Sequence, residues 1–499
     1  MTGPPAGPPA GASDDRVHPT QDDPAVGSLS ESVGGPVGSR AGRHPWWTPV
    51  RVVLALAAIC LALGLVQKTT CYQESWQNGN ERYTHMCYSD VPYLYTGRGL
   101  AELSWPYSDD AETRNRYPVM EYPVLISYWA YGTAWATHWL SGSPDLAPRY
   151  AAPVSDLGQL PGVTEESRRF VAVTMVGLAG LALLAVWLLA GVHRRRPWDA
   201  ALLAASPALL LTAAINWDLV ALVFVAGALW AWSRDKPVLT GVMIGLGTAA
   251  KLYPLFLLGA VLVICLRRRR LPDFGATVLA AVVAWGLVNL PGYVSGPEQW
   301  AHFWTFNSGR AADLGSLWLV VDQAADVGFT ADTINLWSWI LFGAWCVGVV
   351  VLGLRAPVTP RFAQLGLLIL IGFLAVNKVY SPQYVLWLLP LAALARPRLR
   401  DHLVWQGGEI FYFAMVWFYL GGFLDPAGGG DVGFYWVAIG VRVAAELYLA
   451  GLVVRDIARP EHDPVRDPVS SYPTSASFDG PRGDRDVGYD ERADGRVVR

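Results

Sequence analysis

Residues 50–67, VRVVLALAAICLALGLVQ, form an apolar run that is long enough to cross a bilayer as a helix. A polar and aromatic stretch, residues 68–121, follows at once and carries Asp90 within the sequence YSDVPYLY. An acidic residue that is held just outside a bilayer, beside Arg and Tyr side chains, suits chemistry on a lipid-linked substrate. We therefore expect a membrane scaffold built around a functional first loop.

The composition agrees with a membrane protein. Hydrophobic residues make up 53% of the 499 residues and charged residues only 16%, whereas soluble domains carry about 25% charged residues. The apolar runs consist of Leu, Ala, Val and Trp with scattered Gly, and they do not alternate with period two, so packed helices are favoured over barrel strands. We predict an all-α polytopic membrane protein.

Apolar segments recur along the chain up to residue 454, and several are short for a bilayer of about 30 Å. Residues 122–140, rich in Tyr and Trp, are a further candidate, which gives a bundle of about 12–13 transmembrane helices. The main predicted spans are 50–67, 170–192, 199–215, 217–233, 237–252, 253–266, 273–292, 334–354, 362–379, 383–396, 402–422 and 432–454.

Both ends of the chain lack an apolar period. Residues 1–46 and 458–499 are rich in small, polar or charged residues and Pro, and we expect disordered tails there. The transmembrane domain then spans residues 47–457. No signal-peptide cleavage pattern precedes the first apolar run, so we expect that run to be a retained span.

Clusters of Arg and Lys orient the predicted spans. Placing these clusters on the cytoplasmic side of the cell membrane makes both tails cytoplasmic and the 68–121 loop extracytoplasmic. A full crossing by residues 122–140 would break this alternation, so we expect that segment to lie in the interface or to re-enter. The clusters are Arg40 to Arg51, Arg194 to Arg196, Arg234 with Lys236, Arg267 to Arg270, Arg355 with Arg361, Arg396 to Arg400, and Arg455 with Arg459.

The cysteines fall into two groups. Cys60, Cys265 and Cys346 lie in apolar spans and are expected to be inert packing residues. Cys71 and Cys87 share the first loop, where an oxidising exterior would favour a disulfide, and two free thiols are the alternative.

Acidic residues of the first loop are candidates for a general base. Asp90 can accept a proton from a sugar hydroxyl, although an Asp before a short helix can also act only as its N-cap. Glu121, in MEYP at the membrane edge, is a second candidate. Asp109, Asp110 and Glu112 are expected to be solvated.

Polar residues also interrupt the apolar segments. Lys251 can bind a phosphate or snorkel to the headgroups. Asn216 and Asp218, in AINWDLVAL, need a partner or water, or cap a helix start. Arg310 can bind phosphate oxygens as a fork or serve as an ordinary loop Arg.

Two further groups stand out near the C-terminal end. Lys378, Tyr380, Gln383 and Tyr384 gather around Pro382 and indicate a binding site. Arg442 and Glu446, four residues apart in the last span, share a helix face and are expected to neutralise each other in a structural role.

Several activities are excluded. The sequence contains no Walker loop, no dinucleotide fingerprint and no His/Cys cluster with metal-ligand spacing. No predicted cytoplasmic domain is large enough to bind a nucleotide sugar or to hydrolyse ATP. We expect no metal, no cofactor and no nucleic-acid partner, and the energy source must be a membrane-borne substrate or an ion gradient.

The order of these motifs, all on one predicted face, resembles the GT-C superfamily of integral-membrane glycosyltransferases. The closest resemblance is to glycosyltransferase family 87, the actinobacterial polyprenyl-phosphate-mannose-dependent mannosyltransferase group, over residues 50–455. The motifs that carry it are Ser89-Asp90-Val91 with Tyr93 and Tyr95, Glu121-Tyr122-Pro123, Asn216-Trp217-Asp218, Ala250-Lys251-Leu252-Tyr253-Pro254, and Asn377-Lys378-Val379-Tyr380-Ser381-Pro382-Gln383-Tyr384.

This resemblance implies an inverting sugar transfer from a polyprenyl-phosphate donor, with Asp90 as the catalytic base. Mannose is the first choice of sugar and arabinofuranose the second, and the acceptor is a glycolipid or glycan. The candidates for binding the departing phosphate are Arg310, Lys378 and Lys251, in that order. The candidates for contacting substrate are Tyr93, Tyr95, Glu121, Asn216, Asp218, Tyr380 and Gln383.

The sequence departs from the commonest family pattern in two places, where it reads EYPVL without a second Pro and NWD in place of a Gly-Gln turn. These departures leave the acceptor and the sugar open. A transporter or lipid flippase is the main alternative, and a scaffolding role in the cell envelope is another. The lack of a clear internal repeat and the gathering of polar residues on one face favour an enzyme.

Overall fold

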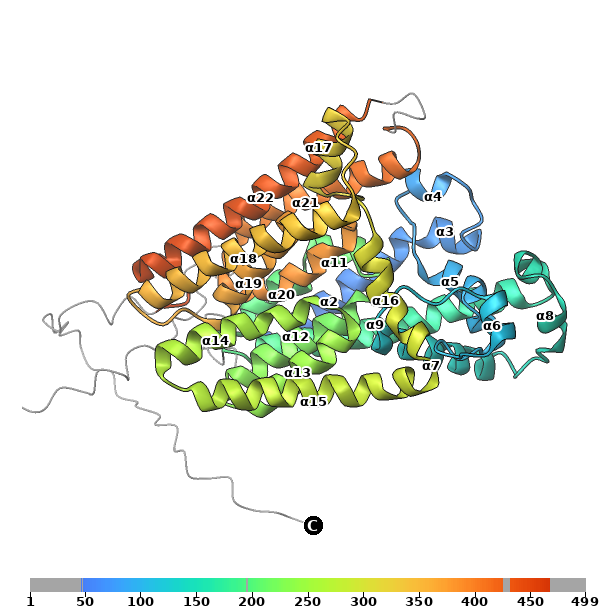
Figure 1. Ribbon diagram of the computed structural model, residues 1–499, viewed down its shortest axis with the longest axis horizontal. Coiled ribbons are helices and arrows are strands. Elements are labelled where there is room, and N and C mark those ends of the chain that lie inside the picture. The colour runs from blue at the N-terminus through green and yellow to red at the C-terminus, as the bar shows by residue number, and fades with distance from the viewer. Residues whose placement is uncertain (1–45, 47, 194–195, 425–430, 467–499) are drawn as a thin grey trace, which may run out of the picture. The chain divides into compact units, whose positions relative to one another are not determined.

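The computed structural model describes residues 46, 48–193, 196–424 and 431–466 of the chain. Within these residues the secondary structure is helical, without a β-strand (Figure 1). Apart from Trp46, the predicted N-terminal tail lies outside the described residues, and so do residues 467–499.

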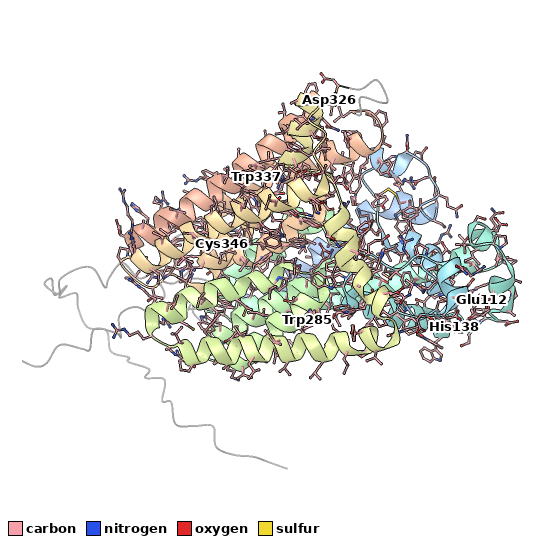
Figure 2. The ribbon with its side chains drawn as sticks, in the orientation of Figure 1. Glu112, His138, Trp285, Asp326, Trp337 and Cys346 are labelled. Atoms are coloured by element: carbon pink, nitrogen blue, oxygen red, sulfur yellow. A yellow bond between two sulfur atoms is a disulfide. The ribbon has the colours of Figure 1, made fainter. Side chains whose placement is uncertain are left out.

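The described part of the chain contains five helices that are long and apolar enough to cross a membrane. They are α2 (Pro49–Gln67), α9 (Val163–Ala190), α15 (Leu271–Ser295), α18 (Ala331–Arg355) and α22 (Gly433–Ala458). Their outer faces expose large apolar side chains, for example Leu279 on α15 and Trp337 on α18 (Figure 2). These features confirm the predicted all-α polytopic membrane protein.

The remaining predicted spans coincide with shorter helices, and the number of crossings stays a prediction. The span predicted at 199–215 is broken, because Ser206 caps a new helix at Pro207, whose ring cannot continue the preceding turn. The shorter helices are η4 (Pro197–Ala200), α10 (Ala201–Ala204), α11 (Pro207–Thr212), α12 (Asp218–Trp232), α13 (Pro237–Ala250), η5 (Tyr253–Phe256), α14 (Leu257–Arg268), α19 (Phe362–Val376), η6 (Pro382–Tyr384) and α20 (Val385–Ala395). The span predicted at 402–422 coincides with α21 (Leu399–Leu420), which has 22 residues but is not among the five.

Small residues allow the central helices to approach closely. Gly241 and Gly245 lie one turn apart on α13, and a Cβ atom on either would collide with the backbone of α15, at Thr277 or Ala281. This spacing of small residues lets two membrane helices pack backbone to backbone. It fixes α13 against α15 and so positions the polar turn that follows α13.

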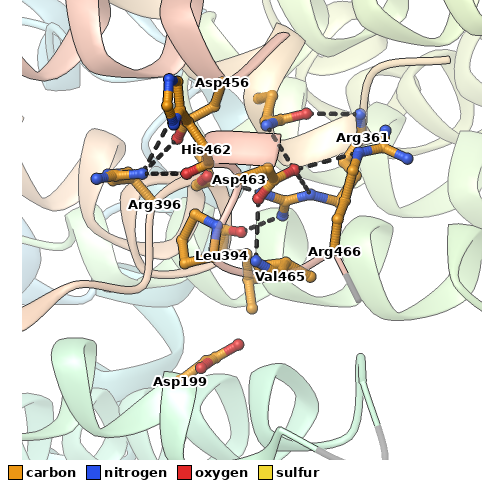
Figure 3. A network of polar contacts seen from close by, with 12 residues as sticks. Asp199, Arg361, Leu394, Arg396, Asp456, His462, Asp463, Val465 and Arg466 are labelled. Carbon is orange, nitrogen blue, oxygen red and sulfur yellow. Dashed lines mark hydrogen bonds and ion pairs between the residues drawn. The ribbon is translucent and has the colours of Figure 1, made fainter. Parts of the chain in front are cut away.

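The described residues of the predicted Arg clusters lie at one end of the helices, which we call the arginine-rich end, while Arg40, Arg43, Arg194 and Arg195 lie outside the described residues. Arg234, just after α12, donates a hydrogen bond to the carbonyl of Gly191 at the end of α9. Arg361, before α19, forms an ion pair with Asp463 at 2.8 Å, and Arg396, after α20, pairs with Asp456 at 2.8 Å (Figure 3). These contacts join helix ends that are far apart in the sequence.

The predicted C-terminal tail begins later than expected. Helix α22 ends at Ala458 and is followed by the short η8 (Pro460–His462), and Asp463 and Val465 are buried. The predicted boundary at residue 457 is therefore wrong, and residues 458–466 belong to the packed unit. The charged composition suggested a solvated segment, but Asp463 neutralises the distant Arg361.

Helix α7 (Val124–Leu140) stays near the first loop. Its Trp129 packs against Gly177 of α9, whereas its His138 lies 3.9 Å from Glu166, more than two turns earlier on α9. The two helices are therefore antiparallel, and α7 accompanies only the first half of α9. Neither end of α7 reaches the arginine-rich end, and the incomplete crossing stays a prediction.

The first loop is a compact set of short helices. They are α3 (Thr69–Gln73), α4 (Glu81–Thr84), α5 (Val91–Gly97), η2 (Leu100–Glu102) and α6 (Ala111–Arg116). A disulfide bond joins Cys71 to Cys87, and Arg116 makes a two-pronged contact with Glu102. Glu112 is exposed on α6 (Figure 2). The loop thus has enough internal contacts to hold a side chain in a fixed position.

Candidate active site

A cavity of about 700 Å³ lies at the opposite end of the helices from the arginine-rich end. The first loop, the start of α12, the turn after α13, α16 (Pro297–Gly309) and the ends of α18 and α19 contribute to its wall. Eight predicted site residues line it: Asp90, Tyr93, Glu121, Asn216, Lys251, Arg310, Lys378 and Gln383. Residues spread over the chain are thus brought to one place.

Asp90 is held by backbone contacts and leaves its carboxylate for the cavity. Its amide and the Ser89 hydroxyl both donate to the carbonyl of Ile215, at 2.8 and 3.1 Å. Asp90 occupies the N-cap position of α5, but its side chain makes no capping hydrogen bond. Instead, the Tyr122 hydroxyl donates to Asp90 Oδ2 at 2.9 Å. A purely capping role for Asp90 is therefore not supported.

Burial sets the acidity of this carboxyl. Desolvation raises the pKa of Asp90 above its ordinary value, and the opposing hydrogen bonds from Tyr122 and Tyr88 and the charge of Lys251 do not cancel the effect. A carboxylate with a raised pKa is a better proton acceptor than an exposed one. The position of Asp90 at the cavity wall therefore suits a general base.

Lys251 is fixed beside this acid by an ion pair. Its ammonium lies 2.9 Å from Asp218 Oδ1, and the Trp387 indole donates to Asp218 Oδ2 at 2.8 Å. The same ammonium sits 4.8 Å from the centre of the Tyr122 ring. Asp218 is fully buried behind Lys251, so its charge offsets that of the lysine.

Two further cations, Arg310 and Lys378, line another part of the cavity. Arg310 forms a two-pronged contact with Asp313, at 2.7 Å from Nε and 2.6 Å from a terminal nitrogen. The Lys378 ammonium donates to Asn335 Oδ1 at 2.6 Å and to the carbonyl of Ser308 at 3.1 Å. The Asp313 amide donates to the Lys378 carbonyl, which ties the two loops together. Arg310 thus shares a partly exposed ion pair with Asp313, whereas Lys378 makes no ion pair among the described residues.

Apolar side chains cover the neighbouring wall. Trp339 and Phe342 of α18 and Phe373 and Val376 of α19 line the cavity close to Lys378. Trp339 is also 56% exposed on the outer surface of the helices. The cavity therefore joins an apolar outer face to the two cations.

Three predicted substrate contacts lie elsewhere. Tyr95 is fully buried and donates to Glu166, and Tyr380 is fully buried and donates to Glu409. Asp218 holds Lys251 and does not line the cavity. Their positions away from the cavity give no support to the prediction that these side chains touch substrate, which stays a prediction. They support the elements that carry the site.

Two other predicted groups have structural partners. Glu121 lines the cavity but forms an ion pair with Arg98, which makes it a poorer base than Asp90. Arg442 pairs with Glu446 at 2.9 Å, as expected, and it also donates to the carbonyl of Gly315. Gly315 has a φ of +68° and no room for a Cβ atom, so this contact fixes the loop after Asp313.

Several cavity residues had not been singled out from the sequence. Tyr88 and Tyr122 lie beside Asp90, and Trp387 and Asn335 hold Asp218 and Lys378 respectively. Tyr122 directly follows Glu121 and Tyr88 lies two residues before Asp90, and this closeness to predicted site residues is the sequence signal that could have identified them. Asn335 and Trp387 lie inside apolar spans and gave no such signal.

A comparison of the sequence with known families relates the chain to a group of enzymes. Residues 148–382 match the model of glycosyltransferase family 87. The chain belongs to this family. It is a membrane-embedded glycosyltransferase, and the all-α fold also fits the GT-C superfamily. No curated protein matches the chain.

The residues that match family 87 form only part of the cavity wall. It includes Asn216, Lys251, Arg310 and Lys378, whereas Asp90 lies in the first loop, before the matched residues begin. The cavity is therefore assembled from the matched region together with the preceding loop.

Proposed function

We propose that this glycosyltransferase transfers a sugar, with mannose as the first choice, from a polyprenyl-phosphate donor to a hydroxyl of a glycolipid or glycan. Asp90 acts as the catalytic base. The observation that carries this proposal is the shared cavity, in which a half-buried carboxylate, the cations Arg310 and Lys378, and an apolar wall lie together. Each of these three features suits one part of a lipid-linked sugar donor.

The reaction is a single displacement. The acceptor oxygen forms a bond to the anomeric carbon while Asp90 accepts the proton of the acceptor hydroxyl. The bond between the anomeric carbon and the phosphate oxygen breaks, and the lipid phosphate leaves with the electron pair. Attack from the face opposite to the leaving group inverts the anomeric configuration.

The leaving phosphate requires fixed positive charge. Arg310 and Lys378 are the first choices, because they line the cavity next to the apolar wall of α18 and α19. Arg offers a planar fork to phosphate oxygens, and Lys offers a compact charge. Lys251 is less suited to this role than to fixing the site, because its partner Asp218 is fully buried, whereas the Arg310–Asp313 pair is partly exposed and Lys378 has no carboxylate partner among the described residues.

The proposed orientation puts the cavity on the extracytoplasmic side of the cell membrane. The arginine-rich end then faces the cytoplasm, in keeping with the preference of positive residues for that side. The Cys71–Cys87 disulfide in the first loop is the kind of bond that persists in an oxidising exterior.

The first test is the transfer of radiolabelled mannose from polyprenyl-phosphate-mannose in membranes that contain wild type, Asp90→Asn or Asp109→Asn protein. Asp109 is an exposed acid of the same loop and serves as the matched control. We expect transfer with wild type and Asp109→Asn, and a loss of about 100-fold or more with Asp90→Asn. Full activity of Asp90→Asn would refute its role as base. Transfer only from polyprenyl-phosphate-arabinose would show that arabinose, and not mannose, is the transferred sugar.

A further inference from the structure

A buried lysine, Lys68, contacts the backbone of the segment that leads to Asp90. Lys68 follows the end of α2, and its side chain is only 4% exposed. Its ammonium donates to the carbonyls of Tyr88, at 3.0 Å, and Met86, at 3.4 Å. No ion pair with a carboxylate is found for it among the described residues. An ammonium group that is buried without a paired anion is costly, so its position calls for an explanation.

The contacts around Lys68 form a clamp on residues 85–88. Gln67 donates to the carbonyls of His85 and Met86, and the Trp76 indole donates to the carbonyl of Cys87. With the two bonds from Lys68, every carbonyl from His85 to Tyr88 receives a hydrogen bond from the chain between residues 67 and 76. The disulfide between Cys71 and Cys87 closes the same unit. This clamp sets the path of the backbone immediately before Asp90.

The charged groups around Asp90 leave a role for the positive charge of Lys68. Lys251 is the cation with the larger effect on Asp90, but it is tied to Asp218, whose negative charge acts on Asp90 in the opposite sense. That pair is close to neutral as a unit. The other polar groups next to Asp90 are the hydroxyls of Tyr88 and Tyr122, which are uncharged. Lys68 is then a cation near Asp90 without a carboxylate of its own.

We propose that Lys68 is a positioning residue for Asp90, whose ammonium holds the Met86–Tyr88 backbone in place and supplies the buried positive charge that favours the carboxylate form of the base. This inference rests on the proposed function of Asp90. Lys68, at the end of the first membrane helix, thus influences the reaction through Asp90, although Lys68 itself does not line the cavity.

The acidity of Lys68 gives this role a pH signature. Desolvation lowers the pKa of Lys68 to about 7, and the charge of Asp90 opposes the effect. The ammonium is therefore present below about pH 7 and is lost above it. Asp90 must be ionised to accept a proton, so activity has an acid limb from Asp90 and an alkaline limb from Lys68.

The test is the pH profile of kcat for mannose transfer by purified full-length wild type, Lys68→Met, Lys68→Arg and Lys236→Met protein. Lys236 is an exposed lysine at the arginine-rich end and serves as control. A His85→Gln variant separates any contribution of that imidazole to the alkaline limb. The folded fraction is measured for each variant by size-exclusion chromatography, and kcat is expressed per folded molecule.

We expect Lys68→Met to lower kcat by about tenfold to a hundredfold, the range for a misplaced catalytic group, to move the acid limb to higher pH and to remove the alkaline limb. Lys68→Arg, if it folds, keeps its charge and moves the alkaline limb upward. An unchanged pH profile in Lys68→Met, with activity that falls only with the folded fraction, would overturn the inference. Absence of transfer by wild type itself would instead refute the proposed donor and leave Lys68 to be retested with the correct one.

Discussion

The Tyr122 hydroxyl donates a hydrogen bond to one oxygen of Asp90, at 2.9 Å from Oδ2. Tyr122 precedes α7 and Asp90 precedes α5, so this contact connects the interior of the first loop to its end. The tyrosine also presents its ring to the ammonium of Lys251. One side chain thus fixes the orientation of the base relative to the neighbouring cation.

Removal of this hydroxyl is expected to weaken the base in a pH-dependent way. Burial raises the pKa of Asp90, and the Tyr122 hydrogen bond counteracts that rise. Tyr122→Phe therefore raises the pKa further and shifts the acid limb of activity to higher pH. We expect a loss of about fivefold below neutral pH, equivalent to roughly 1 kcal/mol for one hydrogen bond. Initial rates across pH, with Tyr150→Phe as an exposed control, test this; a uniform loss at every pH would contradict it.

Arg310 is expected to act on the donor. Arg310→Ala removes a cation that lines the cavity, so the KM for the polyprenyl-phosphate sugar rises by about tenfold or more, the range for a charge-assisted hydrogen bond. The KM for the acceptor changes less. Steady-state rates with each substrate varied in turn provide the measurement, with the exposed Arg169→Ala as control. Equal effects on both substrates would argue against a phosphate role.

The disulfide is expected to stabilise the first loop. Closing a loop of about 15 residues contributes roughly 3 kcal/mol by chain entropy, so the Cys71→Ser, Cys87→Ser double variant unfolds at a lower temperature than wild type. Labelling intact cells with a membrane-impermeant thiol reagent also reports the side of the membrane. We expect labelling of both cysteines only after reduction. Labelling of untreated wild type would show that the bond is absent.

The ion pairs at the arginine-rich end are expected to hold the last residues of the packed unit. Asp463→Ala leaves the buried contact of Arg361 without its carboxylate, which costs about 3–5 kcal/mol. Burial alone would raise the pKa of Asp463, but Arg361 and further hydrogen bonds lower it overall. Its contribution to stability is therefore complete above the ordinary Asp pKa, about 4, and disappears as the pH falls through the lower folded-state value.

Thermal unfolding in detergent measures this effect. The exposed Glu461→Ala change in the same segment is the control. A midpoint for Asp463→Ala that matches the control would show that the segment contributes little to the stability of the folded protein.

The sequence was sufficient to predict the helices, because long apolar runs leave few other structures in a membrane. It also placed the polar turns at Asp90, Lys251 and Lys378 together, since they alternate with spans of similar length. It could not tell on which side of a short helix a tyrosine points. Tyr93 lines the cavity and Tyr95, two residues later, is buried against Glu166.

Long-range polar contacts were also beyond the sequence. The partner of Asp90 is a tyrosine 32 residues away, and the partner of Arg361 is an acid 102 residues away in a stretch with the composition of a tail. Such pairings depend on how the helices pack. For the same reason, Lys68 gave no sign of its proximity to Asp90, because a lysine at the end of a membrane helix ordinarily reaches the headgroups.

The turn between α11 and α12 has a consequence for how this site can change. Carbonyls at a helix end lack their usual helical partners, and here the carbonyl of Ile215 accepts hydrogen bonds from both Ser89 and Asp90. Substitutions that extended α11 or α12 into residues 213–217 would draw this carbonyl into helical hydrogen bonding and withdraw the attachment point of the first loop. Improved local helicity and retained activity are therefore opposing demands at this position, and thermostabilising designs should leave the turn intact.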